Sequence, residues 1–420
     1  MSMRVSYITM KFPAAAETFA CTDIRTLVEA GVEIDVHSMR FQPANAAALL
    51  TERGLPSLAV EYATPWHLWR GAFFALSHPR LLLDTCMWLT PATWRTPKFL
   101  AISLCLLPRS FDILRRLEKA PPDVVHLFWG HYPSIVGYLV RRRLPDCVLS
   151  VFLGAYDLTY AYRPSALLAR EADVVWTHAH ENVSAIGALG VSRTRIEVAH
   201  RGVDLSRFQA AATKVSKRIV CAARLCHDKH VDHVVLAFAR VLEKHPDASL
   251  VIMGEGPERS ALERLVARLK LERAVRFCGH IPHAAVRDEM ARAEFFVLLS
   301  QEETERLTNA TKEALACGCL CIVTRSTGIE ELLADGVHGF VLEHGDIDGA
   351  AGRLEWAIDN ERDAAAIAAA GAEQVRTSFG VVASMQRYIR RWTSLVTTRR
   401  RGDGALASSP AGKASEVLSA

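Results

Sequence analysis

The chain alternates short apolar strands with helices, and this alternation occurs twice. Apolar runs at 4–9, 123–128 and 148–153 precede helical patterns, and a second series of the same kind starts at residue 218. Strands that alternate with helices pair in parallel and are covered by helices on both faces. The sequence therefore predicts an α/β fold with two doubly wound, Rossmann-like domains that face a cleft.

Domain boundaries follow from the breaks in this pattern. The length of 420 residues favours two domains over one. We expect an N-terminal domain at 1–205 and a C-terminal domain at 206–376, with a helix at 377–396 that crosses back to the first domain. The tail 397–420 is rich in Ala, Ser and Gly. We expect it to be disordered, because it lacks the apolar periodicity needed to pack.

An apolar stretch at about 62–108 lies within the first domain. Charged and helix-breaking residues divide it: Arg70, His78, Pro79, Arg80 and Asp84. A membrane span needs about 20 apolar residues in a row, so we do not expect a spanning helix. The main interpretation is a buried helical insertion. The alternative is an interfacial contact with a membrane, in which Trp66, Trp69, Trp88 and Trp94 lie at the headgroup level.

Charge and cysteine content restrict the partners and the location. The net charge of +4 gives no support for a nucleic-acid partner. Basic clusters at 115–116, 141–143, 390–391 and 399–401 are either solvated surface or a contact with an anionic membrane. The ten cysteines include no CxxC pair, which favours buried thiols in a reducing compartment. We expect a cytoplasmic protein without a signal peptide, and peripheral contact with the inner face of the plasma membrane is the alternative.

The stretch from Ser300 to Thr324 carries the densest set of candidate binding groups. It leaves an apolar strand, crosses an acidic loop and enters a short helix near Asn309. The first N–H groups of that helix, those of Asn309, Ala310 and Thr311, can bind a phosphate.

Two carboxylates, Glu305 and Glu313, flank this helix start eight positions apart. They can accept hydrogen bonds from hydroxyl groups on either side of a diphosphate. The expected ligand is therefore a nucleoside-diphosphate sugar.

Two cations follow the first strand of the second domain. Arg224 comes directly after that strand and Lys229 stands five residues later. Ligands of parallel sheets bind beyond the carboxyl ends of the strands, so both side chains are expected at the cleft. Two permanent charges can offset a diphosphate and stabilise it as a leaving group. We therefore expect neither a metal ion nor another cofactor.

Taken together, these motifs resemble family 4 retaining glycosyltransferases of GT-B fold, over most of residues 1–395. Glu305 and Glu313 match the E-x7-E motif of that family, and Arg224 with Lys229 matches R-L-x-x-x-K. The other matches are the G-x-G-P turn at 254–257, the F-x-G-x-[VI] segment at 277–281, and an opening at Phe12-Pro13 with Glu17, Thr18 and Phe19. This opening is similar to exopolysaccharide and colanic-acid members of the family.

The resemblance implies a role for each of these positions. Glu313 would bind the ribose diol, Glu305 the donor sugar, and Asn309 with the following amides the phosphates. The remaining donor-side positions are Gly254, Gly256, Gly279, His280 and Ile281, with Glu17 and Thr18 in the N-terminal loop. The implied reaction retains the anomeric configuration by front-side attack, in which the leaving phosphate accepts the proton of the acceptor.

Two positions depart from the family pattern. Many relatives carry a catalytic histidine where this chain has Leu153, so His131, Asp157 and His126 are the alternative candidates. Arg306 occupies the position of a glycine that usually follows the first glutamate. It either crowds the donor sugar or recognises an acidic sugar such as a uronic acid.

The predicted function is transfer of a sugar from a nucleoside-diphosphate sugar to a glycan or a polyprenyl-linked acceptor, in exopolysaccharide or cell-envelope polysaccharide synthesis. An inactive GT-B-like binding protein is one alternative, which Leu153 and Arg306 keep open. A GT-B sugar-nucleotide epimerase is the other, although the paired motifs do not favour it.

Overall fold

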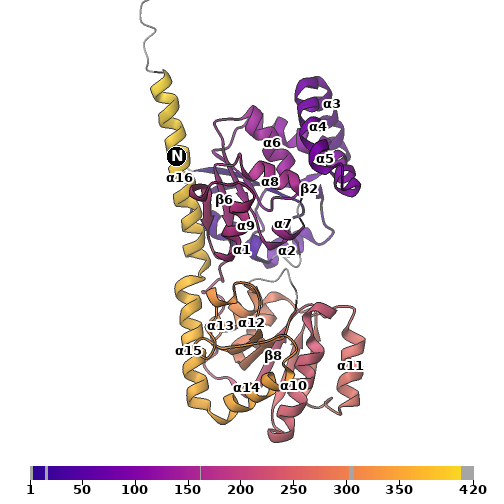
Figure 1. Ribbon diagram of the computed structural model, residues 1–420, viewed down its shortest axis with the longest axis vertical. Coiled ribbons are helices and arrows are strands. Elements are labelled where there is room, and N and C mark those ends of the chain that lie inside the picture. Colours follow the sequence, from indigo (N-terminus) through magenta and orange to yellow (C-terminus); the bar gives the residue numbers. More distant parts are fainter. Residues whose placement is uncertain (1–2, 15–17, 161, 302–306, 408–420) are drawn as a thin grey trace, which may run out of the picture.

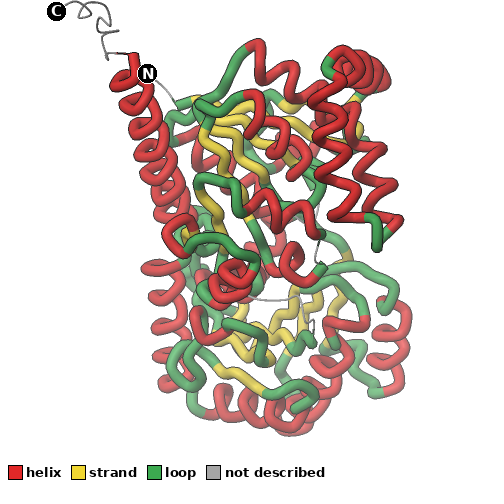
Figure 2. The backbone as a smooth tube through the Cα atoms, turned by 45° about the horizontal axis from the view of Figure 1, so that its top comes forward, coloured by secondary structure: helices red, strands yellow, loops and turns green. Residues whose placement is uncertain are grey.

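The computed structural model describes residues 3–14, 18–160, 162–301 and 307–407, with the backbone alone for 401–407. Within these ranges the chain forms two domains, one above the other in Figure 1. Each domain contains one parallel sheet with helices packed around it. Figure 2 shows the strands of each sheet surrounded by helices. The predicted α/β class with two doubly wound domains is confirmed.

The first sheet has the order β3-β2-β1-β4-β5-β6-β7 among the described residues, and its strand pairs are parallel. Its strands are β1 Arg4–Thr9, β2 Glu33–Phe41, β3 Val60–Ala63, β4 Val124–Leu127, β5 Val148–Phe152, β6 Val174–Thr177 and β7 Ile196–Val198. The helices that accompany them are α1 Thr18–Glu29, α2 Ala46–Glu52, α6 Ser134–Arg143, α7 Ala155–Thr159, α8 Arg163–Ala169 and α9 Glu181–Ala188. Strands β4, β5 and β6 are buried along their whole length, as expected of a sheet covered on both faces.

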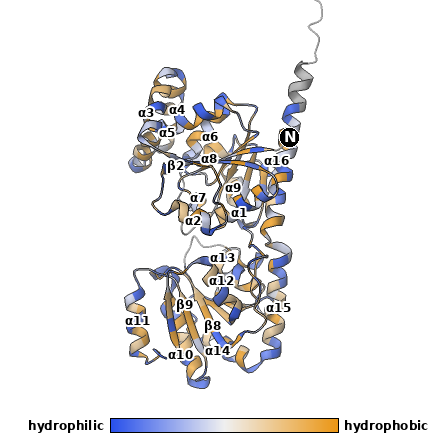
Figure 3. Ribbon diagram, turned by 180° about the vertical axis from the view of Figure 1, so that it is seen from behind, coloured by the Kyte–Doolittle hydropathy of each residue, from blue (hydrophilic) through white to orange (hydrophobic). Residues whose placement is uncertain are grey.

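The second sheet has the order β10-β9-β8-β11-β12-β13. Its strands are β8 Val215–Ala222, β9 Ser249–Met253, β10 Val275–Gly279, β11 Ala293–Leu298, β12 Leu320–Thr324 and β13 Phe340–Leu342. The helices are α10 Val231–Lys244, α11 Arg259–Arg268, α12 His283–Arg292, α13 Asn309–Ala316, α14 Ile347–Asp359 and α15 Glu361–Ser378. Figure 3 shows that the strands of this sheet are apolar along the centre of the domain. Their carboxyl ends carry the loops that face the first domain.

The apolar stretch forms three helices at the outer side of the first domain: α3 Pro65–Ser77, α4 Pro79–Thr93 and α5 Pro97–Lys119. Helix α3 lies directly on α5, because Gly71 has no side chain. A Cβ atom at Gly71 would stand 1.7 Å from the carbonyl oxygen of Pro108. Within the described residues, every helix is too short or too polar to cross a bilayer.

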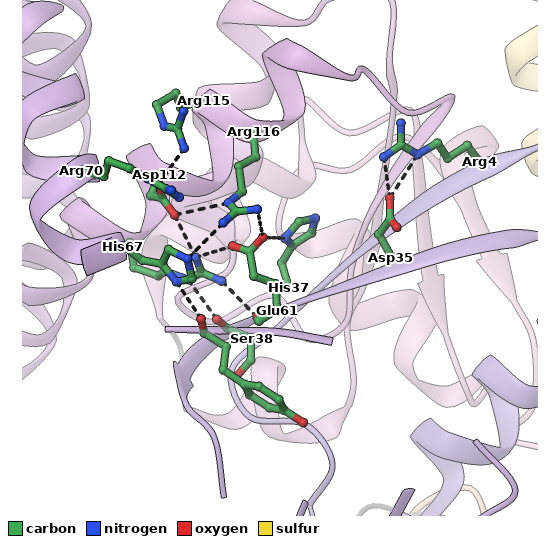
Figure 4. Close-up of polar contacts among 12 residues, drawn as sticks. Arg4, Asp35, His37, Ser38, Glu61, His67, Arg70, Asp112, Arg115 and Arg116 are labelled. Atoms are coloured by element: carbon green, nitrogen blue, oxygen red, sulfur yellow. Dashed lines mark hydrogen bonds and ion pairs between the residues drawn. The ribbon is translucent and has the colours of Figure 1, made fainter. Parts of the chain in front are cut away.

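A cluster of ion pairs connects this insertion to the edge of the first sheet (Figure 4). The Asp112 carboxylate of α5 is completely buried and accepts hydrogen bonds from Arg70 and Arg109. Glu61 of β3 lies beside it and pairs with Arg109 at 2.8 Å and with Arg116 at 2.6 Å. The insertion is therefore held by buried charge pairs as well as by apolar contacts.

Helix α16, Val381–Ala407, runs along the first domain after the chain leaves α15 (Figure 1). At the crossing, Val203 pairs with Gly380 in an isolated parallel bridge. Trp392 is completely buried against the first sheet, and its Nε1 donates a hydrogen bond to Ser150 Oγ at 2.9 Å. The C-terminal helix is thus attached to the first sheet.

The prediction of a disordered tail from residue 397 was wrong for 397–407, which continue α16. Two arginines explain the difference, because the composition of the tail does not reveal which residues they contact. Arg399 pairs with Asp173 at 2.6 Å, and Arg400 pairs with Asp123 at 2.5 Å. These contacts hold the helix against the first domain as far as Arg400. Residues 408–420 lie outside the described part of the chain.

Candidate active site

Two adjoining cavities between the domains bring together most of the predicted donor-side residues. The first cleft cavity, of about 420 Å³, is lined by Arg224, Gly254, Gly279, His280 and Ile281 from the second domain. The second, smaller cleft cavity, of about 70 Å³, is lined by Asn309 and Glu313. Thr18 of α1 lines both cavities, so the first domain closes over this part of the second.

The glycines of the turn at 254–257 are required by close backbone packing. Gly254 has φ +144°, and a Cβ atom there would stand 1.8 Å from the carbonyl oxygen of Ala223. At Gly256 the added atom would stand 2.2 Å from the carbonyl oxygen of Leu225. The turn therefore supports the loop that carries Arg224. Gly254 lines the first cleft cavity, whereas Gly256 is absent from the residues lining it.

The two predicted cations have different surroundings. Arg224 is exposed and lines the first cleft cavity. Lys229 is only 8% exposed and ends a short 3-10 turn, His227–Lys229, in which its N–H donates to the carbonyl oxygen of Cys226. Only Arg224 is thus presented directly to the cavity in this arrangement.

Helix α13 starts where the sequence predicted, with Thr308 at its N-cap position. Its first intrahelical bond is donated by the N–H of Lys312 to Thr308. The preceding N–H groups of Asn309, Ala310 and Thr311 have no acceptor within the helix, as at any helix start. Asn309 lines the second cleft cavity, Ala310 is half-buried beside it in the sequence, and Thr311 is buried. This geometry suits an anion at the mouth of α13.

Glu313 is oriented by a histidine that the sequence did not single out. His283, the first residue of α12, donates from Nε2 to Glu313 Oε1 at 3.1 Å. The backbone N–H of His283 donates to Glu52 Oε1 of α2 at 3.3 Å. Glu52 and His283 line both cleft cavities and stand at their boundary. One residue therefore connects the Glu313 carboxylate to the first domain.

A buried lysine beside Glu313 ties α13 to the first domain. Lys312 is 1% exposed, and its Nζ donates to the carbonyl oxygen of Arg201 at 2.8 Å. Burial, together with the charge of Arg201, lowers the pKa of Lys312 to about 7. The guanidinium of Arg201 lies 3.8 Å from the ring centroid of Phe19 and 4.6 Å from that of Trp129. Lys312, Arg201 and these rings thus pack together at the junction of the domains, and Phe19 also lines the second cleft cavity.

His131 and Asp157 form a close pair at the carboxyl ends of the first sheet. His131 Nδ1 lies 2.6 Å from Asp157 Oδ1, and the other carboxylate oxygen accepts the N–H of Gly154 at 3.0 Å. A Cβ atom at Gly130 would stand 2.4 Å from Leu153, so Leu153 fills the space next to this pair. Neither His131 nor Asp157 is among the described residues that line the two cleft cavities.

His126, the third candidate, lies in the interior of the first domain. Its Nδ1 is 2.9 Å from Ser150 Oγ, its ring contacts Tyr7, and burial lowers its pKa to about 3. A neutral, enclosed imidazole of this kind is structural. Of the two histidines, His131 is therefore the better candidate for contact with a substrate.

Three predicted site residues, Glu17, Glu305 and Arg306, lie outside the described residues. A further cavity of about 760 Å³ is lined by Ser300 and Thr308, which precede and follow residues 302–306 in the sequence. Thr311 lines it together with His227 and Asp228.

Three groups of described residues have the spacing of metal ligands: His180 with His200 and Glu331, His230 with Asp232 and His233, and Glu61 with His67 and Asp112. In the third group the carboxylates of Glu61 and Asp112 are already paired with Arg109. In the first group Glu331 accepts hydrogen bonds from His200 and from two backbone N–H groups. None of the three includes a predicted donor-side residue.

Parts of the chain are similar to known glycosyltransferases. Residues 203–374 match the family model described as glycosyl transferases group 1. N-acetyl-alpha-D-glucosaminyl L-malate synthase of Bacillus anthracis is 27% identical over 57% of this chain and 66% of its own length. WcaL of Salmonella typhimurium, a glycosyltransferase assigned to colanic acid biosynthesis, is 24% identical over 84% of this chain and 90% of its own length.

The fold itself recurs in a solved structure. HepE of Anabaena in complex with UDP has a TM-score of 0.72 to this chain at 17% identity, over 93% of this chain and 100% of that one. A TM-score of this size over nearly the whole chain indicates a shared fold. The chain is therefore a two-domain α/β protein of GT-B fold whose residues 203–374 match the model of the glycosyl transferases group 1 family.

Proposed function

We propose that the protein transfers a sugar, with retention of anomeric configuration, from a nucleoside-diphosphate sugar to a glycan or a polyprenyl-linked acceptor. The observation that carries this proposal is the pair of adjoining cleft cavities. One contains Arg224 and the turn Gly279 to Ile281, and the other contains Glu313 and the start of α13. The base, the ribose and the phosphates of a nucleotide would each meet a suitable partner along these two cavities.

In the proposed binding mode the base contacts the backbone of Gly279, His280 and Ile281. The ribose hydroxyls donate to Glu313, whose other contact is the imidazole of His283 at 3.1 Å. The phosphates meet Arg224 and the N-terminus of α13, and both favour negative charge. Lys229 would support this charge from behind Arg224. These cations take the part that a divalent ion has in other transferases, so we propose that no metal is needed.

Catalysis would depend mainly on positioning and on charge stabilisation at the leaving group. In the proposed front-side reaction the bond from the anomeric carbon to the phosphate oxygen breaks as the acceptor oxygen attacks the same face. The acceptor proton passes to the leaving phosphate. Asp157 holds Nδ1 of His131, which leaves Nε2 of that ring to contact the acceptor or the sugar hydroxyls.

The names of related proteins suggest where the product is used. The relative from Salmonella typhimurium is assigned to colanic acid biosynthesis, and HepE was solved with UDP. On this basis we propose a role in exopolysaccharide or cell-envelope polysaccharide synthesis, with a uridine-linked sugar as the first donor to test. A polyprenyl-linked acceptor resides in a bilayer, so the protein would work in peripheral contact with the inner face of the plasma membrane.

The test is a screen of sugar nucleotides for hydrolysis by the purified protein, followed by NMR analysis of the products. Release of a nucleoside diphosphate and a free sugar of retained configuration is expected, with the activity lost in Glu313→Ala. Glu243→Ala serves as the matched control, because Glu243 is an exposed carboxylate in the last turn of α10 and lines neither cleft cavity. Conversion of one sugar nucleotide into its epimer would instead identify an epimerase. Absence of turnover and of binding for every donor would overturn the proposal.

A further inference from the structure

Helices α3 and α4 expose an unusual amount of large apolar side chain. In α3 the outward residues are Trp66, Trp69, Phe73 and Leu76, and in and after α4 they are Leu83, Met87 and Trp94. These seven side chains are between 59% and 77% exposed. Single exposed apolar residues are common on protein surfaces, but a group of this size marks an interaction site.

The spacing of these residues indicates that each helix presents its exposed apolar residues on one face. Positions 66, 69, 73 and 76 recur at intervals of three and four, as do 83, 87 and 94 after one helical turn is skipped. The opposite faces are already used, since Gly71 and Ala75 of α3 and Leu89 of α4 are buried. The exposed apolar stripes therefore do not take part in the packing of the insertion.

The charges around the stripes are mostly positive. Between residues 62 and 111 the sequence has a single acidic residue, Asp84, and several basic ones. Arg70 and Arg109 are bound to Asp112 in the buried cluster. Arg80, Arg95 and Lys98 are exposed, and the described residues place no carboxylate within ion-pair distance of them. This leaves an apolar surface with a cationic margin.

The other basic clusters of the chain do not offer such a surface. Their arginines are mostly engaged in ion pairs: Arg115 and Arg116 with Asp112 and Glu61, Arg141 with Asp173, Arg142 with Glu171, Arg143 with Glu118, Arg391 with Glu197, Arg399 with Asp173, and Arg400 with Asp123. The sequence clusters that suggested an anionic membrane are thus largely neutralised among the described residues, although Arg390 is exposed. Arg80, Arg95 and Lys98, in contrast, lie beside the apolar stripes.

We propose that the α3–α4 face, defined as the seven exposed apolar residues with Arg80, Arg95 and Lys98, docks onto the surface of an anionic lipid bilayer. Tryptophan is favoured at the headgroup level, and arginine and lysine gain from acidic lipid. The helices lie in the interface rather than crossing it, in agreement with the absence of a spanning helix among the described residues. The purpose of docking rests on the proposed function, because a polyprenyl-linked acceptor is reached from the bilayer surface.

The experiment uses the full chain and sedimentation with vesicles of phosphatidylglycerol mixed with phosphatidylcholine, or of phosphatidylcholine alone. Binding to the mixed vesicles is expected, and the double variant Trp69→Ser with Phe73→Ser should weaken it by about tenfold or more for each side chain that enters the lipid. Arg95→Gln with Lys98→Gln should weaken it by about fivefold per charge at low salt. Because all four side chains are exposed, these variants are expected to fold.

A matched control removes exposed apolar groups elsewhere. Val337→Ser with Val382→Ser, at positions 53% and 57% exposed outside the insertion, should leave vesicle binding unchanged. Quenching of tryptophan fluorescence by brominated lipid should fall in Trp69→Phe, which keeps an apolar side chain. Equal binding of the stripe variant and the wild type would overturn the proposal.

Other occupants of this face would give different results. If the wild-type chain binds neither kind of vesicle but sediments with native membranes, its partner is a membrane protein. That result would overturn lipid docking. Self-association that the Trp69→Ser and Phe73→Ser changes abolish, without vesicle binding, would indicate a second copy of the chain and would overturn it as well. Donor binding is measured on every variant. Lost vesicle binding with intact donor binding separates a failure of docking from a failure of the proposed transferase.

Discussion

Replacing Glu61 with glutamine should loosen the connection between the helical insertion and the first sheet. The Glu61 carboxylate is 18% exposed and contacts His37, Arg109 and Arg116 (Figure 4). Burial alone would raise the pKa of Glu61, but the nearby His37 together with the hydrogen bond and charge of Arg109 outweighs burial and lowers the pKa from 4.5 to about 2. The charged form of Glu61 is therefore stabilised in the folded protein.

This shift sets the size and the sign of the effect. A fall from 4.5 to about 2 corresponds to about 3 kcal/mol of folding free energy, and partial exposure to solvent reduces it to about 2 kcal/mol. Because the folded-state pKa is below the unfolded value, the stabilisation is complete above pH 4.5 and is lost as the pH falls toward 2. Glu61→Gln should lack both the stabilisation and this part of the pH dependence.

The measurement is urea unfolding of the wild type, Glu61→Gln and the surface control Glu263→Gln at a series of pH values. Hydrogen exchange reports separately on α3 and α5. Glu61→Gln should lower the unfolding free energy by about 2 kcal/mol at pH 7, with faster exchange in the insertion, and should differ less from the wild type near pH 3. Identical midpoints for Glu61→Gln and the wild type at pH 7 would refute the reasoning.

Three further changes test other parts of the structure. His283→Ala should raise the donor KM by roughly tenfold with little change in kcat, because a hydrogen bond to a charged group contributes about 1.5–3 kcal/mol; an unchanged KM would mean that other groups orient Glu313. Asp157→Asn should lower kcat by about 10²-fold or more while donor affinity, measured by calorimetry, stays constant, and a parallel loss of affinity would contradict a role on the acceptor side. Gly71→Ala should lower the melting temperature, since its Cβ would meet the carbonyl oxygen of Pro108 at 1.7 Å, whereas Gly352→Ala, in open space on α14, should be neutral or stabilising.

The sequence predicted the elements that local patterns determine. The strand before Arg224, the glycine turn at Gly254 and the start of α13 near Asn309 were each placed within a few residues. Parallel strands that alternate with helices bring their carboxyl ends to one edge of the sheet. This is why the structure gathers Arg224, Gly254 and Gly279 at a single cavity.

What the sequence could not predict depends on contacts between distant segments. Glu52 and His283 are 231 positions apart, and no periodicity links them. Lys312 appears in the sequence as an ordinary helix lysine, yet the packing of the domains buries it. The helical state of 397–407 follows from Arg399 and Arg400 meeting aspartates more than 220 positions earlier. Such pairings require the packing angles of whole elements, which composition does not contain.

The most direct test of a nucleotide-sugar cleft is equilibrium binding of a panel of uridine- and guanosine-diphosphate sugars, followed by calorimetry. At least one donor should bind the wild type and Glu243→Ala equally. Its affinity should fall by about tenfold or more in Glu313→Ala and in Arg224→Ala, because each loses a hydrogen bond to a polar or charged donor group. If no donor binds, or if donors bind the Glu313 and Arg224 variants as tightly as the wild type, the assignment of the two cleft cavities is contradicted.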